Sequence, residues 1–254
     1  MTFNNVLNKF RAESFTQKDK GTQFERLMRS WLLSDPRYSN LTDVWMWEDF
    51  PSKADFGGKD TGIDLVARTD TGDYWAIQCK CYKEDATIDK PAVDSFLATS
   101  SRTFKDVDTL QTTSFSNRLW ISTTNKWGVN AEEVIQRQIL PVNRVSLVDL
   151  QNSPVDWQLL LDGLKGKDAM LPGKQPLEHQ LRAMSAAHYY FTTHDRGKLV
   201  MACGTGKTYT ALKIAEEMLP EKGLVLFLVP SISLLGQTLN AWCADATKPI
   251  KGIC

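Results

Sequence analysis

Residues 62–80 read Gly62-Ile-Asp-Leu-Val-Ala-Arg-Thr-Asp-Thr-Gly-Asp-Tyr-Trp-Ala-Ile-Gln-Cys-Lys80 and contain two short, largely apolar runs. The runs, 63–67 and 74–79, flank a polar turn, which is the pattern of a β-hairpin. A three-residue loop over 70–72 is favoured because Gly72 can adopt a positive φ. This loop sets a register in which Asp64 lies directly opposite Gln78.

Side chains alternate between the two faces of such a hairpin. Asp64, Gln78 and Lys80 are therefore expected to gather on one face, at one end. The other face is expected to hold Ile63, Leu65, Ala67, Trp75, Ile77 and Cys79. Burying a carboxylate, a carboxamide and an ammonium without partners is costly. The hairpin therefore predicts a ligand at this end, and a metal ion with a phosphate is the natural candidate.

The composition is that of a soluble globular protein. The 254 residues are enough for one large or two ordinary domains, and Lys plus Arg equals Asp plus Glu at 30 each. Any contact with nucleic acid must therefore be a local patch rather than a global positive charge. The five cysteines lack the spacing of a zinc site, and reduced cysteine thiols suit a cytosolic protein. No apolar run is long enough to span a bilayer.

A Gly-, Pro- and Lys-rich stretch divides the chain into two expected domains. We expect a first domain over 1–164, a linker over 165–176 and a second domain over 177–254. In the first domain the patterns predict helices at 24–32, 91–100, 131–140 and 155–164, and strands at 44–47, 118–122 and 145–150. In the second they predict helices at 177–192, 208–219 and 231–242, and strands at 198–202 and 224–229. The second set indicates a parallel α/β unit.

The stretch Met201-Ala-Cys-Gly-Thr-Gly-Lys-Thr208 has the pattern of a phosphate-binding loop between a strand and a helix. Gly204, Thr205 and Gly206 would offer backbone N–H groups to phosphates at the start of the helix. Lys207 would reach the β- and γ-phosphates of ATP, and the Thr208 hydroxyl would hold the accompanying Mg²⁺. The alternative is a Gly-rich turn in an ordinary α/β domain.

With Met201 in place of glycine, this loop resembles the form found in superfamily 2 helicases and translocases. Upstream, Leu177-Glu-His-Gln-Leu-Arg182 resembles the motif by which that family reads adenine, with Gln180 the matching residue. Downstream, 229–237 resembles a motif that contacts the DNA backbone, which implies that Ser231 and Ser233 donate to phosphate. Otherwise Gln180 is a surface helix residue and Ser231 only a helix cap.

Asp64 with Gln78-x-Lys80 resembles the PD-(D/E)xK nucleases, in the Gln-x-Lys variant of Mrr-like enzymes. The resemblance implies that Asp64, the Gln78 amide oxygen and the Cys79 carbonyl hold Mg²⁺, while Lys80 positions or activates the attacking water. It also implies that an acidic residue on the first helix, here Glu25, completes the site. Alternatives remain: Lys80 as an edge-strand gatekeeper, Asp64 as a cap, Glu25 as a solvated helix residue and Asp60 as a rival ligand.

Taken together, the chain resembles the opening of the single-polypeptide Type ISP restriction–modification enzymes. The segments 44–51, 60–67, 76–82 and 201–208 carry this resemblance. It implies a bacterial, cytoplasmic, ATP-dependent enzyme acting on double-stranded DNA. A second RecA lobe, a methyltransferase and a target-recognition domain would follow Cys254, and a second enzyme copy would meet the first on DNA for cleavage.

We therefore expect a restriction-endonuclease-like mixed α/β sheet flanked by helices, followed by a partial RecA-like parallel α/β domain. The expected function is a Mg²⁺-dependent DNA endonuclease coupled to an ATP-driven translocase. Two other classes are compatible with the residues: a non-cleaving DNA-binding adaptor on a motor, and a small NTPase with an unrelated first domain. No Asp-Glu-x-His-type motif follows the phosphate loop, so this chain alone is expected to turn over ATP negligibly.

Overall fold

The computed structural model describes residues 1–13, 16–57, 62–83, 85–219, 223–248 and 250. The chain divides into two compact units, Met1–Leu171 and Pro172–Cys254, which are considered separately below. The division falls inside the stretch 165–176. Residues 166–171 nevertheless pack on the first unit, since the Asp156 N–H donates to the Ala169 carbonyl and the Leu171 N–H to the Pro154 carbonyl.

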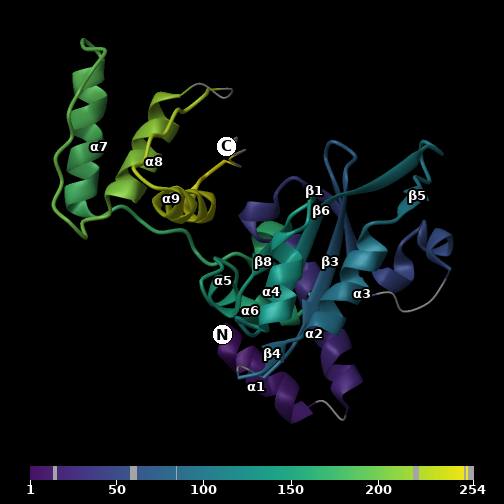
Figure 1. Cartoon of the computed structure of the whole chain (residues 1–254). Coiled ribbons are helices and arrows are strands. Elements are labelled where there is room, and N and C mark those ends of the chain that lie inside the picture. Colours follow the sequence, from purple (N-terminus) through teal and green to yellow (C-terminus); the bar gives the residue numbers. More distant parts are fainter. Residues whose placement is uncertain (14–15, 58–61, 84, 220–222, 249, 251–254) are drawn as a thin grey trace. The chain divides into compact units, whose positions relative to one another are not determined.

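A six-stranded mixed sheet forms the centre of the first unit (Figure 1). Its strands are β1 (Leu41–Met46), β2 (Leu65–Thr69), β3 (Tyr74–Lys80), β5 (Thr103–Lys105), β6 (Thr112–Ser122) and β8 (Val142–Val145). The order is β1-β2-β3-β6-β5, and β8 also pairs with β6. Neighbours are antiparallel from β1 to β3 and parallel from β3 through β6 to β8, while β5 runs antiparallel to β6. Outside this sheet, β4 (Thr87–Ile88) and β7 (Lys126–Trp127) form a short parallel pair.

Helices cover both faces of the sheet and enclose two apolar cores. Helices α1 (Phe3–Glu13), α2 (Gln17–Leu32), α5 (Leu147–Gln151) and α6 (Trp157–Leu161) pack on one face. Helices α3 (Lys90–Ser100) and α4 (Val129–Gln136) pack on the other. The apolar stripe expected on the first helix is buried, with Phe24, Leu27, Met28, Trp31 and Leu32 all in the core. The expected mixed sheet flanked by helices is thus confirmed.

The hairpin follows the predicted register and loop. Leu65 pairs with Ile77 and Val66 with Ala76, so one further step places Asp64 opposite Gln78. Gly72 takes φ +87°, and its N–H donates to the Thr69 carbonyl at 3.0 Å. Leu65, Ala67, Ile77 and Cys79 face the core under α2, and Trp75 packs against it. The prediction for Ile63 is wrong: it packs in the opposite core, because it precedes β2 and does not follow the alternation of that strand.

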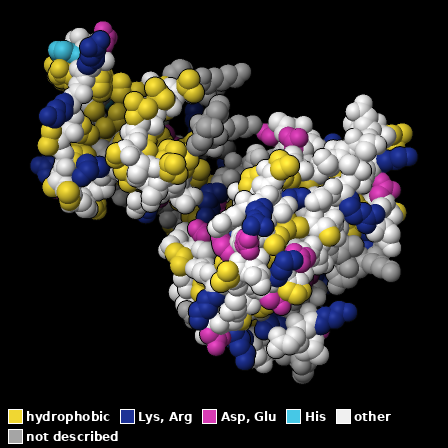
Figure 2. Space-filling view, in the orientation of Figure 1, with side chains coloured by type: hydrophobic (Ala, Val, Ile, Leu, Met, Phe, Trp, Pro, Cys, Tyr) yellow, Lys and Arg dark blue, Asp and Glu magenta, His cyan; other side chains and the backbone are white. Residues whose placement is uncertain are grey.

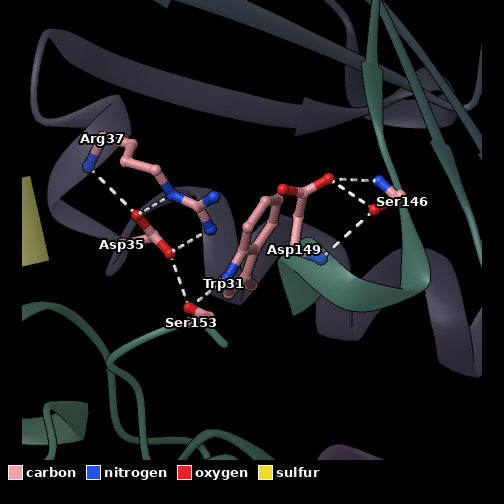
Figure 3. Close-up of polar contacts among 6 residues, drawn as sticks. All are labelled: Trp31, Asp35, Arg37, Ser146, Asp149 and Ser153. Carbon is pink, nitrogen blue, oxygen red and sulfur yellow. Dashed lines mark hydrogen bonds and ion pairs between the residues drawn. The ribbon is translucent and has the colours of Figure 1, made fainter. Parts of the chain in front are cut away.

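The strand predicted at 145–150 is also wrong. Strand β8 ends at Val145 and α5 begins at Leu147. Ser146 and Asp149 form a reciprocal capping box, in which each side chain accepts the other's backbone N–H (Figure 3). This cap starts a helix where the apolar run alone suggested a strand. Helix α4 likewise ends at Gln136, before the expected 140.

The second unit contains α7 (Glu178–Phe191), α8 (Lys207–Met218) and α9 (Ile232–Asp245). Within the described part of this unit, the segments predicted as strands at 198–202 and 224–229 have no strand partner. The side chains of Leu224, Leu226 and Leu228 are 85%, 82% and 81% exposed. Figure 2 shows many apolar side chains on the surface of this unit. The apolar pattern marks a segment suited to a buried sheet, but a strand forms only where a neighbour supplies its hydrogen bonds.

A buried polar network anchors the carboxyl end of α2 (Figure 3). Asp35 is 1% exposed, and both of its carboxylate oxygens accept bonds from the Arg37 guanidinium. The Ser153 hydroxyl donates to Asp35 at 2.5 Å and accepts the Trp31 Nε1–H at 2.8 Å. Because Ser153 lies between α5 and α6, the network ties α2 to the last helices of the unit.

Replacing Asp35 tests this anchor. Asp35→Ala leaves the Arg37 guanidinium and the Ser153 hydroxyl without their acceptor. We expect a loss of about 3–5 kcal/mol in the free energy of unfolding of the first unit, as for other broken buried pairs. Urea unfolding followed by tryptophan fluorescence measures it. The exposed pair Glu133–Arg137 provides the control, since Glu133→Ala is expected to cost about 0.5 kcal/mol or less. Equal losses in the two variants would contradict this account.

Candidate nuclease site and phosphate loop

Asp64 closes the open end of the β2–β3 hairpin. Its backbone N–H donates to the Ile77 carbonyl at 2.9 Å. Its carboxylate Oδ2 accepts the backbone N–H of Cys79 at 2.7 Å and also the side-chain amide of Gln78. At the end of the β2–β3 ladder, the Asp64 side chain thus accepts the Cys79 N–H that a backbone carbonyl would otherwise accept. The capping role considered for Asp64 is present, and it fixes the carboxylate beside Gln78.

Gln78 is the most constrained polar group of the site. The residue is 1% exposed, and its amide nitrogen donates to Asp64, while Oε1 is buried with no hydrogen-bond partner among the described residues. Leaving a buried acceptor unpaired costs about 1–3 kcal/mol. Gln78 Oε1 therefore lies buried near the Asp64 carboxylate, and a hydrogen-bond donor or a cation would stabilise it.

These oxygens suit a hard cation. Mg²⁺ prefers oxygen ligands and retains several waters, so one carboxylate and an amide oxygen are a sufficient protein contribution. In the described residues, no group of three or more His, Cys, Asp or Glu side chains gathers in a metal-binding arrangement. A cation here would therefore depend on Asp64, on the Gln78 oxygen and on backbone oxygens such as the Cys79 carbonyl.

Glu25 and Lys80 lie on different elements, and the charge of each acts on the Cys79 thiol. Glu25 lies half-buried on α2, and Lys80 is the last residue of β3. Burial first, then the carboxylates of Asp64 and Glu25, raise the pKa of the Cys79 thiol well above its usual value, while the Lys80 charge lowers it. The structure thus brings the Asp64 carboxylate to the Gln78 amide and the Cys79 N–H, while Glu25 and Lys80 act on the Cys79 thiol through their charges.

Lys80 is half-buried, and its carbonyl accepts the Thr123 N–H at 3.2 Å. Strand β3 lies between β2 and β6 inside the sheet. The gatekeeper reading of Lys80 is therefore wrong, because that role belongs to edge strands. The rival ligand Asp60 lies outside the described residues.

Gly62 positions Asp64 and was not recognised from sequence. It takes φ +77°, and a Cβ built on it would lie 2.8 Å from Ser95 Oγ and 3.0 Å from the Phe96 backbone nitrogen. Only glycine combines this backbone conformation with so close an approach to α3. The sequence offered one indication of this role: Gly62 lies two residues before Asp64, just before the start of a strand.

The phosphate loop has the backbone that its glycines predict. Gly204 and Gly206 take φ +77° and +79°, and Gly206 is the cap of α8. Thr205 Oγ1 donates to the Ala202 carbonyl at 2.7 Å, and Lys207 Nζ donates to the same carbonyl at 3.2 Å. Thr208 is half-buried in the first turn of α8, and its carbonyl accepts the Trp242 Nε1–H at 2.9 Å.

Gln180 is buried against the phosphate loop and is not exposed on the surface of α7. It is 6% exposed, so the surface-residue reading is wrong. Its Nε2 donates to the Thr205 carbonyl at 3.0 Å, and its Oε1 accepts the Leu177 N–H at 2.9 Å. Ser231 Oγ accepts the Leu234 N–H at 3.2 Å as the cap of α9, and Ser233 is exposed on that helix. Ser231 therefore caps α9 as the alternative interpretation predicted, with its hydroxyl oxygen acting as the hydrogen-bond acceptor.

Comparison with protein families gives a decisive match. A family model described as "Restriction endonuclease" matches residues 33–167, which is just over half of the chain. The chain belongs to this Mrr-type restriction endonuclease family. A second family model, described as "Type III restriction enzyme, res subunit", matches residues 173–250. This chain therefore contains a restriction endonuclease domain followed by a helicase-like segment.

Among solved structures, the chain is similar to one described as "ATP-dependent Type ISP restriction-modification enzyme LlaBIII bound to DNA". The TM-score is 0.75 at 32% sequence identity, and the match covers 97% of this chain and 15% of LlaBIII. The resemblance to the Type ISP enzymes is thereby confirmed. A search of curated proteins found no match. In the described residues, no helix is long and apolar enough to cross a membrane.

Two glycines of the phosphate loop provide a matched test of its packing. A Cβ at Gly206 would lie 2.3 Å from Gln180 Nε2, whereas one at Gly204 would meet nothing within 4 Å. Both Gly→Ala changes place alanine at a positive φ, which costs about 1–2 kcal/mol. Gly206→Ala must also displace Gln180, so we expect a larger fall in the thermal midpoint of the second unit. Circular dichroism during heating measures both, and equal shifts would contradict the contact.

Proposed function

We propose that this chain supplies the Mg²⁺-dependent DNA-cleaving domain of an ATP-dependent restriction–modification enzyme, together with the first part of its translocase motor. The observation that carries the proposal is Gln78 Oε1, which lies buried beside the Asp64 carboxylate without a hydrogen-bond partner in the described parts of the chain. Family membership supports the reaction class, and the similarity to LlaBIII supports the coupling to ATP and DNA. The proposed setting is the bacterial cytoplasm.

In this proposal Asp64, the Gln78 amide oxygen and the Cys79 carbonyl hold Mg²⁺. When bound, the metal polarises the scissile phosphodiester and lowers the pKa of a coordinated water. Lys80, at the end of a central strand, offsets negative charge that develops on the phosphate and orients the attacking water. Glu25 adds a second carboxylate from α2. Gln78 in place of an acidic residue leaves the site with one less negative charge.

The motor part is proposed to bind ATP–Mg²⁺ at Gly204, Thr205, Gly206, Lys207 and Thr208. Lys207 is held by loop carbonyls in this structure and would exchange them for phosphate oxygens. Gln180 would give up its bond to Thr205 or to Leu177 in order to read adenine. Ser231 uses its oxygen as a helix cap but retains an O–H, so it can still donate to a DNA phosphate with Ser233.

The remaining partners are proposed from likeness, because the chain spans only 15% of LlaBIII. We propose that a second RecA lobe, a methyltransferase and a target-recognition domain belong to the same polypeptide. Double-stranded DNA is the proposed substrate, and cleavage is proposed to require a second enzyme copy brought up by translocation.

Alanine variants of the full enzyme test the nuclease assignment. Asp64→Ala removes a metal ligand and Lys80→Ala removes the charge beside the phosphate, so each is expected to lower the cleavage rate by on the order of 10²-fold or more. DNA-stimulated ATP hydrolysis should persist in both. The exposed residues Asp49 and Lys167 supply charge-matched controls, since Asp49→Ala and Lys167→Ala should cut normally. If a folded Asp64 or Lys80 variant cuts at the wild-type rate, the domain is an adaptor.

ATP turnover tests the coupled-motor part separately. The 254-residue chain is expected to hydrolyse ATP negligibly, because no Asp-Glu-x-His-type motif follows its phosphate loop. Hydrolysis would be measured by phosphate release, with and without DNA. Turnover at the rate of a complete motor would refute this expectation, and turnover independent of DNA in the full enzyme would favour the simple NTPase class.

A further inference from the structure

Two neighbouring side chains of α7 contact the same backbone carbonyl of the phosphate loop. His179 and Gln180 are the second and third residues of α7, and the Nε2 atom of each lies 3.0 Å from the Thr205 carbonyl oxygen. Gln180 is buried and His179 is half-buried. Helices α7 and α8 lie side by side in this unit (Figure 1), so the start of α7 reaches the loop that opens α8.

The chemistry of the carbonyl fixes which atom of the imidazole carries a hydrogen. A carbonyl oxygen accepts hydrogen bonds and cannot donate them, so His179 Nε2 must be the donor to Thr205. Nε2 carries a hydrogen in one neutral tautomer and also in the charged imidazolium. The contact therefore requires a donor at Nε2 but does not require a positive charge on His179.

Holding the Thr205 carbonyl also aims the N–H at the other end of the same peptide. The peptide bond between Thr205 and Gly206 is trans and planar, so the Gly206 N–H points away from the Thr205 carbonyl. Because that carbonyl faces α7, the N–H is turned away from α7. Gly206 is the cap of α8, and the N–H groups at the start of a helix suit phosphate oxygens.

The next peptide of the loop is held from within α8. The Gly206 carbonyl accepts the Thr210 N–H at 3.0 Å and the Thr210 hydroxyl at 3.1 Å, and Thr210 is fully buried. The Thr205 carbonyl precedes the helix and receives its side-chain contacts from α7 instead. Side chains of α7 therefore control an orientation that the start of α8 does not set by itself.

His179 and Gln180 differ in what else they are asked to do. Gln180 Oε1 also accepts the Leu177 N–H at 2.9 Å, and in the proposed function Gln180 exchanges one of its bonds for adenine. The bond from His179 to Thr205 can persist through that exchange. His179 is thus the member of the pair that is free to hold the loop while nucleotide is bound.

We propose that His179 is a positioning residue for nucleotide binding. Its Nε2–H holds the Thr205 carbonyl and thereby aims the Gly206 N–H at the phosphates. The inference rests on the proposed binding of ATP–Mg²⁺ at this loop. Because His179 acts through the loop peptide, it supports the phosphate part of the ligand and does not contact the base.

Helix α7 contains a matched histidine for the test. His188 is exposed in the last turn of α7, roughly 13 Å further along the helix at 1.5 Å per residue. His179→Ala and His179→Leu both remove the donor, and the leucine keeps most of the volume. His179→Gln retains an N–H of similar reach on a residue that suits a helix. The probes are ATPγS and inorganic tripolyphosphate, each with Mg²⁺, and calorimetry measures their binding to the full enzyme without DNA.

We expect His188→Ala to bind both probes like the wild type. His179→Ala and His179→Leu should bind both about threefold to tenfold more weakly, which is the effect of one lost hydrogen bond, and His179→Gln should recover to within about twofold of the wild type. Circular dichroism during heating identifies any variant that does not fold. Wild-type affinity for tripolyphosphate in a folded alanine or leucine variant would overturn the positioning role. A folded glutamine variant as weak as these would also overturn it.

Lys207→Ala reports separately on the proposed ATP site. It should lose most of the affinity for both probes, because Lys207 is proposed to contact the phosphates. A wild type that binds neither probe, or a Lys207→Ala variant that binds like the wild type, would contradict the ATP site itself. Weaker binding in Lys207→Ala with unchanged binding in the folded His179→Ala and His179→Leu variants would overturn only the role of His179.

Discussion

The Asp64 carboxylate holds the register of the β2–β3 hairpin, and the rest of the first unit depends on that register. It accepts the Cys79 N–H and the Gln78 amide at the end of the ladder. A slip of one residue would turn every side chain of a strand to the other face. Leu65, Ala67 and Ile77 would then leave the core under α2, and the polar end of the hairpin would be lost.

The same constraint explains why a polar cluster survives inside a well-packed sheet. Strand β3 lies inside the sheet and has an apolar core on each face. Polar groups at the end of β3 are therefore largely buried but still lie near the surface. The network around Asp35 anchors the carboxyl end of α2, the helix that carries Glu25. In the proposed function, the Gln78 oxygen, which has no hydrogen-bond partner among the described residues, represents stability given up locally for the capacity to bind a cation.

Local patterns predicted the features that depend on neighbours in sequence. The hairpin loop follows from Gly72, the buried stripe of α2 follows from its helical spacing, and the polar end follows from strand alternation. Features that depend on distant contacts were not predictable in this way. Gly62 is required because α3 approaches it, and Lys80 lies inside the sheet because β6 pairs with β3 from far along the chain. The strands expected at 198–202 and 224–229 need neighbours that local patterns do not specify.

The central claim is that Asp64 and Gln78 together form an oxygen-ligand cation site. Electron paramagnetic resonance titration with Mn²⁺, which Mg²⁺ should displace, measures it directly and without any cleavage. The account predicts weaker binding in Asp64→Asn by at least about tenfold and tighter binding in Gln78→Glu, because the latter restores a negative charge at a buried ligand position. Affinity unchanged in both variants would contradict the account, since the cation would then be held elsewhere.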